Sequence, residues 1–329
     1  MAIDFVKVFD KFNSLNILII GDVMIDAYWW GGVNRISPEA PVPVCAVNDK
    51  ESRLGGAANV ALNIAAMGAN PILCSVVGED YQGHQLCELM EKQNMDTKGI
   101  VFSSNRPTTV KTRIIGNKTQ MLRIDEETDV NISLSEEKAF VAKIEKIINT
   151  EKINAIIFQD YDKGVITEGV ITKIIEIARR KNIPITVDPK KRNFTAYKNV
   201  DLFKPNLKEL KEGLKIDFDN VDKDVLVEAS LLLHYKQKID KVFITLSEKG
   251  VFMMDLTKKE AEVTMLPACL RKISDVSGAG DTVISLATLC LALGLDSQII
   301  AKVSNIAGGL VCESLGVVPI DKNKLLSEL

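Results

Sequence analysis

Short runs of consecutive apolar residues alternate with amphipathic stretches along most of the chain. The apolar runs predict buried strands at residues 16–21, 72–77, 155–158, 185–187, 242–246 and 251–254. Helical spacing of apolar residues predicts helices at 57–67, 83–93, 135–150, 167–181, 207–214 and 225–235. Buried strands that alternate with helices are typical of a mostly parallel sheet covered on both faces, so the pattern predicts an α/β fold.

Two segments, 27–47 and 108–125, do not follow this rhythm. The first is irregular and then alternates apolar and polar residues from Pro41 to Val47, and the second alternates over much of its length. Alternation of this kind predicts half-exposed strands, which we expect to form a small β lid over the ends of the main strands. No linker rich in proline, glycine or serine divides the chain, so we predict a single domain over residues 1–329.

Composition excludes several classes of function. The chain is 46% hydrophobic and 26% charged, and its net charge of −3 argues against nucleic acid as a partner. Six scattered cysteines without a Cys-x-x-Cys pair, and only two histidines, make a zinc site unlikely and fit a cytoplasmic protein. No apolar run is long enough to predict a membrane span.

A glycine-rich turn that leads into an apolar helix is the strongest candidate site. Residues 275–281 read DVSGAGD, and the apolar run 283–293 follows. Backbone N–H groups at a helix N-terminus bind anions, and Gly278 and Gly280 have no Cβ to keep a phosphate away. Asp281 would repel that phosphate, unless its carboxylate takes a proton from a hydroxyl that attacks the phosphate. The alternative is that Asp281 only caps the helix.

Two common nucleotide-binding motifs do not account for this turn. A dinucleotide-binding fingerprint fits poorly, because Val283 stands where the third small residue is required. A Walker A loop is also absent, because residues 116–119 (GNKT) lack the upstream glycine and the adjacent Gly-Lys pair.

Further polar residues follow the other predicted strands, at the edge where parallel sheets bind ligands. Asn206 and Glu209 are one helical turn apart, and their oxygen atoms suit Mg²⁺. The other candidates at these strand ends are Asp22, Asp26, Gly55, Gly56, Asn59, Asp160, Lys163, Asp188, Lys190, Thr245, Ser247 and Gly250. Each of them alone could be a turn residue, but their convergence on one edge favours a site.

These motifs together resemble the ribokinase-like (phosphofructokinase B type) carbohydrate kinases. The two family signatures are similar to residues 55–59 (GGAAN) and 275–281, and the Mg²⁺-associated motif is similar to Asn206-x-x-Glu209. Residues 21–26 (GDVMID), 35–44 (RISPEAPVPV) and 160–164 (DYDKG) resemble one branch, the kinases of D-glycero-D-manno-heptose 7-phosphate in bacterial ADP-heptose synthesis for lipopolysaccharide. The resemblance implies a three-layer α/β/α sandwich with a β lid. It also implies ATP and Mg²⁺ as cofactors, with a monovalent cation as a further candidate.

The resemblance also assigns roles to residues. Asp281 would take the proton of the anomeric hydroxyl, while the turn of Gly278, Ala279 and Gly280 holds the γ-phosphate. Sugar binding would use Asp22, Asp26, Gly55, Gly56, Asn59, Asp160 and Lys163. Nucleotide binding would use Asp188, Lys190, Thr245, Ser247, Gly250, Ser277 and Asn305, with Mg²⁺ at Asn206 and Glu209. The 7-phosphate needs cations on the lid, for which Lys111, Arg113 and Arg123 are candidates; the alternative is that they form a solvated strand face.

Three hypotheses of function follow. The first is an ATP-dependent heptose 7-phosphate kinase, the second a kinase of another sugar or a nucleoside, and the third a non-catalytic sugar-phosphate sensor. The intact Gly-Ala-Gly-Asp run argues against a sensor. Many relatives carry an adenylyltransferase domain with a His-x-Gly-His motif; the only histidines here are His84 and His234, so we expect kinase activity alone. An open lid edge also predicts a homodimer through residues around 36–47 and 110–124.

Overall fold

The larger of two sheets carries the expected parallel strands. In the computed structural model, which describes residues 3–218, 220–269 and 271–329, its order is β13 (Glu262–Leu266), β12 (Val251–Asp255), β11 (Lys241–Thr245), β10 (Leu202–Phe203), β9 (Ile185–Asp188), β8 (Ala155–Gln159), β1 (Asn16–Gly21), β4 (Asn70–Gly78) and β5 (Ile100–Ser103). The strands from β11 to β5 in this order run parallel, and β12 and β13 add an antiparallel edge. The α/β prediction is confirmed.

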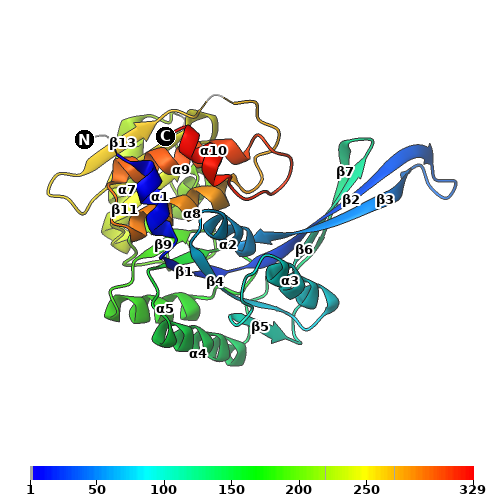
Figure 1. The fold of residues 1–329 in the computed structure, drawn as a ribbon, viewed down its shortest axis with the longest axis horizontal. Coiled ribbons are helices and arrows are strands. Elements are labelled where there is room, and N and C mark those ends of the chain that lie inside the picture. The colour runs from blue at the N-terminus through cyan, green and yellow to red at the C-terminus, as the bar shows by residue number, and fades with distance from the viewer. Residues whose placement is uncertain (1–2, 219, 270) are drawn as a thin grey trace.

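Helices cover both faces of this sheet (Figure 1). One face packs against α1 (Phe5–Phe12), α2 (Ala57–Ala66), α3 (Tyr81–Lys92), α8 (Ala279–Ala292), α9 (Ser297–Val311) and α10 (Lys322–Ser327). The other packs against α4 (Leu134–Thr150), α5 (Glu168–Arg180), α6 (Leu207–Leu214) and α7 (Lys223–Gln237). Strand β1 supplies both cores, because successive side chains point to opposite faces: Ile17 and Ile19 join the first core, and Leu18 and Ile20 the second.

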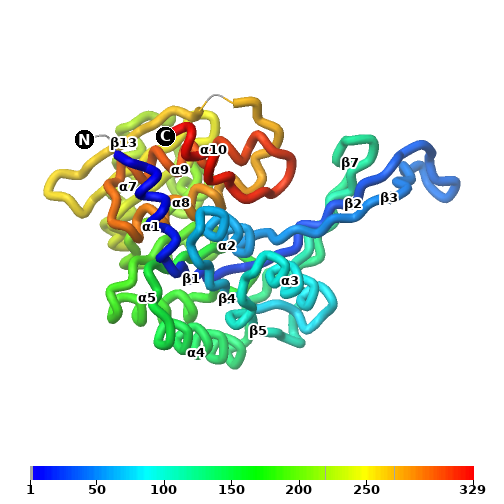
Figure 2. Tube along the Cα trace, in the orientation of Figure 1, coloured from blue at the N-terminus to red at the C-terminus, as the bar shows by residue number. Residues whose placement is uncertain are grey.

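The second sheet is the lid. Its order is β3 (Pro43–Gly56), β2 (Val23–Ile36), β6 (Val110–Gly116) and β7 (Thr119–Glu126), and it projects from the body of the molecule (Figure 2). The two alternating segments do form a separate sheet, but the expected irregular stretch after Ala27 is wrong, since β2 is a continuous strand with bulges. It pairs with β3 on one side and β6 on the other, and these partners supply backbone hydrogen bonds that local sequence does not reveal.

The ends of the main strands gather the candidate residues at one edge. Strand β1 leads almost directly into β2, and β3 runs into α2 at Gly56. Gly55 and Gly56 therefore end a lid strand and lead directly into the helix that was expected after them. Both lid strands consequently enter the body beside the α8 N-terminus, because α2 and α8 pack together. In the described part of the chain, no helix has the length and hydropathy that a membrane crossing requires.

Candidate active site

The N-terminus of α8 is open to a ligand. Its N-cap is Gly278, which has φ 81° and provides no side-chain cap. Asp281 lies in the first turn and is therefore not the N-cap, which removes the alternative that it only caps the helix. The left-handed conformation at Gly278 favours glycine, and the macrodipole favours an anion at this end of the helix.

The Asp281 carboxylate is buried and held by three donors. Its side chain is 3% exposed, and Asn59 Nδ2 donates to Oδ2 at 2.8 Å. The Tyr161 hydroxyl and Gln159 Nε2 donate to Oδ1 at 2.6 and 3.2 Å. Burial raises the pKa of Asp281 to about 6, although the hydrogen bonds from Asn59 and Tyr161 act in the opposite direction. A carboxylate with this pKa is ionised near neutral pH and still basic enough to accept a proton.

A buried cation lies beside this turn. A Cβ on Gly280 would be 3.6 Å from Lys204 Nζ and 3.8 Å from Asp188 Oδ2, so this face of the turn has room for a ligand. Lys204 is 3% exposed and its Nζ is 3.0 Å from Asp188 Oδ2. Gln159 Nε2 also donates to Asp188 Oδ2, at 3.1 Å, and so links Asp188 to Asp281.

Asn206 and Glu209 form a capping box at the start of α6. Asn206 Oδ1 accepts from Glu209 N at 2.8 Å, and Glu209 Oε2 accepts from Asn206 N at 2.9 Å. Glu209 Oε1 pairs with Lys190. No cluster of three or more His, Cys, Asp or Glu suited to a metal occurs in the described residues. The donor set nevertheless fits Mg²⁺, which proteins commonly hold through one or two carboxylates together with nucleotide phosphates and water.

Asp22 has a structural role that was not expected. It is 1% exposed, and its carboxylate accepts hydrogen bonds from the backbone N–H groups of Tyr161, Lys163 and Val165 at 2.8, 3.3 and 3.0 Å. These contacts use the carboxylate to shape the loop after β8. The structure thus shows Asp22 holding the loop, and its contact with sugar hydroxyls stays a prediction.

Asp160 and Lys163, on the same loop, are also engaged by the protein. Asp160 is buried and accepts from Asn193 Nδ2 at 3.0 Å and from the Tyr197 hydroxyl at 2.8 Å. Burial and the nearby Asp22 raise the pKa of Asp160. Lys163 Nζ is 2.7 Å from Glu127 Oε1. Asp160 therefore lies in the interior with Tyr197, while Lys163 joins the loop to the lid.

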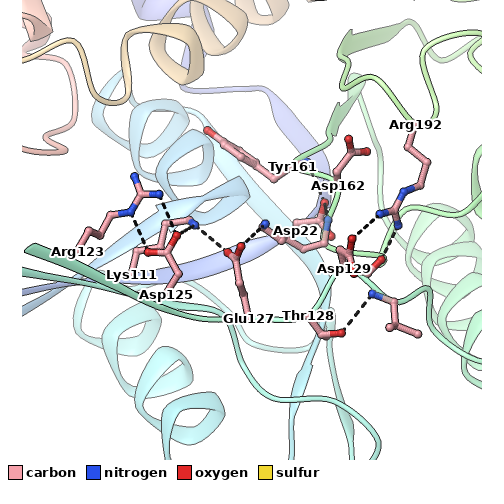
Figure 3. A network of polar contacts seen from close by, with 12 residues as sticks. Asp22, Lys111, Arg123, Asp125, Glu127, Thr128, Asp129, Tyr161, Asp162 and Arg192 are labelled. Carbon is pink, nitrogen blue, oxygen red and sulfur yellow. Dashed lines mark hydrogen bonds and ion pairs between the residues drawn. The ribbon is translucent and has the colours of Figure 1, made fainter.

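The lid cations are paired with carboxylates (Figure 3). Arg123 contacts Asp125 at 2.8 Å, and Lys111 contacts Asp125 at 3.1 Å and Glu127 at 2.7 Å. Arg113 pairs with the buried Asp26 and lies over the Tyr28 ring, 5.2 Å from its centroid. The three expected phosphate cations thus lie on the lid, each with a carboxylate partner, and Arg113 engages Asp26.

The residues expected to bind the nucleotide lie in two places. One is the end of β11 with the turn that follows it, and the other is the region of α8 and α9. Thr245 forms a β-bridge with Asn206, and Ser247 and Gly250 bound the tight turn between β11 and β12. Ser277 N donates to Asp275 Oδ1 at 3.0 Å, and Asn305 Nδ2 on α9 donates to the Pro267 carbonyl at 2.8 Å.

Three residues at the centre of the site were missed from the sequence. Lys204 directly precedes the Pro-Asn pair of the Mg²⁺-associated motif, Gln159 is a polar residue at the end of a buried strand, and Tyr161 lies in the 160–164 run. Their positions in a motif or at a strand end suggested that they belong to the site. The sequence did not indicate that they contact Asp281 or the glycine-rich turn.

The fold and the site define a carbohydrate kinase. The chain belongs to the pfkB family of carbohydrate kinases, because the model of that family matches residues 14–323. It is 39% identical to bifunctional protein HldE of Methylobacillus flagellatus over 313 residues, and 40% identical to that of Aliarcobacter butzleri over 303 residues. These matches cover 95% and 92% of this chain, but the chain spans only 63% and 61% of the length of those relatives.

Solved structures share the fold. Phosphofructokinase-2 from Escherichia coli in complex with fructose-6-phosphate has a TM-score of 0.76 at 18% identity, covering 96% of this chain and 99% of its own. Arabidopsis thaliana ribokinase complexed with ribose and ATP has a TM-score of 0.71 at 15% identity, with 95% and 98% covered. At these identities the likeness establishes the ribokinase-like fold alone, and that prediction is confirmed.

Proposed function

We propose that this chain transfers the γ-phosphate of ATP to the anomeric hydroxyl of D-glycero-D-manno-heptose 7-phosphate, forming the 1,7-bisphosphate. The observation that carries the phosphoryl transfer is the buried Asp281, held by three donors in the first turn of the open α8 N-terminus. The heptose phosphate is supported by the 21–26, 35–44 and 160–164 runs, and by relatives named bifunctional protein HldE. We also propose a cytoplasmic location, which the free cysteines support.

The proposed mechanism places the base on one side of the α8 N-terminus and positive charge on the other. Asp281 takes the proton of the attacking hydroxyl, and Gln159 and Asn59 keep its carboxylate in place. The backbone N–H groups of the α8 first turn and the Lys204 ammonium hold the γ-phosphate as charge shifts in the transition state. Mg²⁺, near Glu209, Asn206 and the ATP phosphates, would neutralise phosphate charge.

A second candidate, a kinase of an unphosphorylated sugar, is favoured by one observation. Lys111, Arg113 and Arg123 all have carboxylate partners. A substrate phosphate would have to compete with these carboxylates, whereas a neutral sugar would not. The choice between the two therefore depends on whether the enzyme recognises a phosphate on its substrate.

A phosphorylation assay across seven- and six-carbon sugars, each with and without a terminal phosphate, tests both candidates. We expect turnover with heptose 7-phosphate and a new anomeric phosphate signal in the ³¹P NMR spectrum of the product. Faster turnover of the free heptose would support the second candidate. Asp281→Asn is the control and should lose at least ~10²-fold in kcat, the lower end of general-base contributions. Replacing potassium or sodium by a large organic cation in the same assay tests the monovalent cation.

A further inference from the structure

The two oxygens of the Asp281 carboxylate have different environments. Oδ1 accepts hydrogen bonds from Tyr161 at 2.6 Å and from Gln159 at 3.2 Å, while Oδ2 accepts one from Asn59 at 2.8 Å. A carboxylate oxygen accepts about two hydrogen bonds. Oδ1 is therefore saturated, and Oδ2 keeps one acceptor site that no described residue fills.

Tyr161 is held in this position through its backbone. Asp22 accepts from the N–H groups of Tyr161, Lys163 and Val165, and so fixes both ends of the loop that follows β8. The loop turns through positive φ values at Asp162, 55°, and Gly164, 81°. None of these hydrogen bonds of Asp22 goes to Asp281, so we expect its influence on that carboxylate to pass through Tyr161.

We propose that Tyr161 and Gln159 select the basic atom of the site: they saturate Oδ1, so that Asp281 receives the substrate proton on Oδ2. Asp22 is the positioning residue that keeps Tyr161 in place. This inference rests on the proposed phosphoryl transfer. In that step the hydroxyl O–H bond breaks and its proton passes to Oδ2. The sugar oxygen bonds to the γ-phosphorus, and the bond from that phosphorus to the β,γ-bridging oxygen breaks, leaving its electron pair on ADP.

A consequence for the pH profile follows from the charges around Asp281. The titratable groups that face it are Tyr161, Asp188, Lys190 and Lys204. The Tyr161 hydrogen bond lowers the pKa of Asp281 against the effect of burial. Turnover falls as pH falls through this pKa, because a protonated carboxyl cannot accept the substrate proton. Removal of the Tyr161 hydroxyl therefore moves the acid limb of kcat to higher pH, by about one to two units for a charge-assisted hydrogen bond.

The test is the pH profile of kcat for Tyr161→Phe, with Tyr197→Phe as the matched control. Tyr197 is a buried tyrosine, and its hydroxyl likewise donates to a buried carboxylate, that of Asp160, at 2.8 Å. We expect the acid limb to move up for Tyr161→Phe and to stay in place for Tyr197→Phe. Asp22→Asn should move it in the same direction as Tyr161→Phe. An unchanged midpoint for Tyr161→Phe, or the same shift in the control, would overturn the proposal.

The plateau of the same profile tests the choice of oxygen. Loss of the Tyr161 hydroxyl leaves the carboxylate less restrained, so kcat above the midpoint should fall. A plateau above that of the wild type would show that Tyr161 occupies the oxygen that takes the proton, which contradicts the assignment to Oδ2.

A ¹³C NMR titration of the Asp281 carboxyl carbon separates this proposal from the proposed function, because it needs no substrate. The signal is the one that Asp281→Asn removes. Its midpoint should rise in Tyr161→Phe and not in Tyr197→Phe. Absence of turnover by the wild type with every sugar rejects the proposed function. Turnover by the wild type, with no shift of the midpoint in Tyr161→Phe, rejects the role of Tyr161 alone.

Discussion

At the scale of single residues, two lysines form ion pairs with buried aspartates, but only one lies beside the phosphate turn. Lys204 pairs with Asp188 at 3.0 Å, and both side chains are under 10% exposed, at 3% and 7%. Lys241 pairs with Asp255 at 2.6 Å, with side chains 13% and 4% exposed. The second pair joins β11 to β12. Variants of the two lysines can therefore separate the contribution of a buried ion pair to stability from the contribution of Lys204 to catalysis.

Lys204→Met and Lys241→Met should destabilise the protein similarly but differ in activity. Each leaves a buried aspartate unpaired, and breaking a buried pair costs about 3–5 kcal/mol. Only Lys204→Met removes a cation from the proposed phosphate site, so only it should lower kcat strongly. The measurements are thermal unfolding and kcat at a temperature where both variants are folded. Equal kcat values for the two variants would show that Lys204 has a structural role only.

At the scale of elements, the α8 N-terminus depends on two glycines for different reasons. Gly278 has φ 81°, and a Cβ there would be 2.9 Å from Asn59 Nδ2, the donor to Asp281. At Gly280 a Cβ would meet its nearest neighbours at ordinary contact distances of 3.6 and 3.8 Å. The first glycine is required by the protein itself, and the second leaves space for a ligand.

Gly278→Ala and Gly280→Ala should therefore have opposite signatures. Gly278→Ala strains the backbone and displaces Asn59, so both the unfolding temperature and kcat should fall. Gly280→Ala should keep or raise the stability, because alanine is about 1 kcal/mol better than glycine in a helix. Its methyl group would obstruct the phosphate, so KM for ATP should rise. Thermal unfolding and steady-state kinetics measure both effects. An unchanged KM for ATP in Gly280→Ala would place the phosphate elsewhere.

At the scale of the whole molecule, the lid presents exposed apolar side chains away from the body. They are Ile36, Val42, Val47, Met121, Leu122 and Ile124. Both β3 and β7 are edge strands of the lid sheet. Exposed edges and apolar patches are usually covered in stable proteins. The homodimer through the lid therefore stays a prediction that these residues support.

Leu122→Lys should convert the proposed dimer to a monomer. Leu122 on β7 is 57% exposed, so the charge should cost little within one chain but would be buried at a lid–lid contact. Leu231→Lys on α7, a residue that is 46% exposed, is the matched control and should leave the mass unchanged. Light scattering at micromolar concentration measures the result. A wild-type protein that is monomeric and fully active contradicts the prediction.

Local pattern alone was sufficient for most of the elements that enclose the sheet and for the glycine-rich turn before α8. The predicted helices end within two residues of the observed ones, as for 57–67 against Ala57–Ala66 and 225–235 against Lys223–Gln237. The pattern did not predict α1, α9, α10, β5 and β13. It also missed the short strand β10 and the lid strand β2, because their pairing partners define them more than their own residues do. Hydrophobic periodicity reports which face of an element is buried, and this is a local property.

The sequence by itself determined the α/β fold, the lid as a separate layer, and the glycine turn with its aspartate. Only the tertiary structure decided which groups touch that aspartate, since Asn59, Gln159 and Tyr161 lie 222, 122 and 120 positions away along the chain. It also decided that Asp22 holds a loop and that the lid cations have carboxylate partners. The physical reason is that burial follows from the spacing of residues along one element. The partner of a polar side chain depends on which elements the folded chain brings together at the sheet edge.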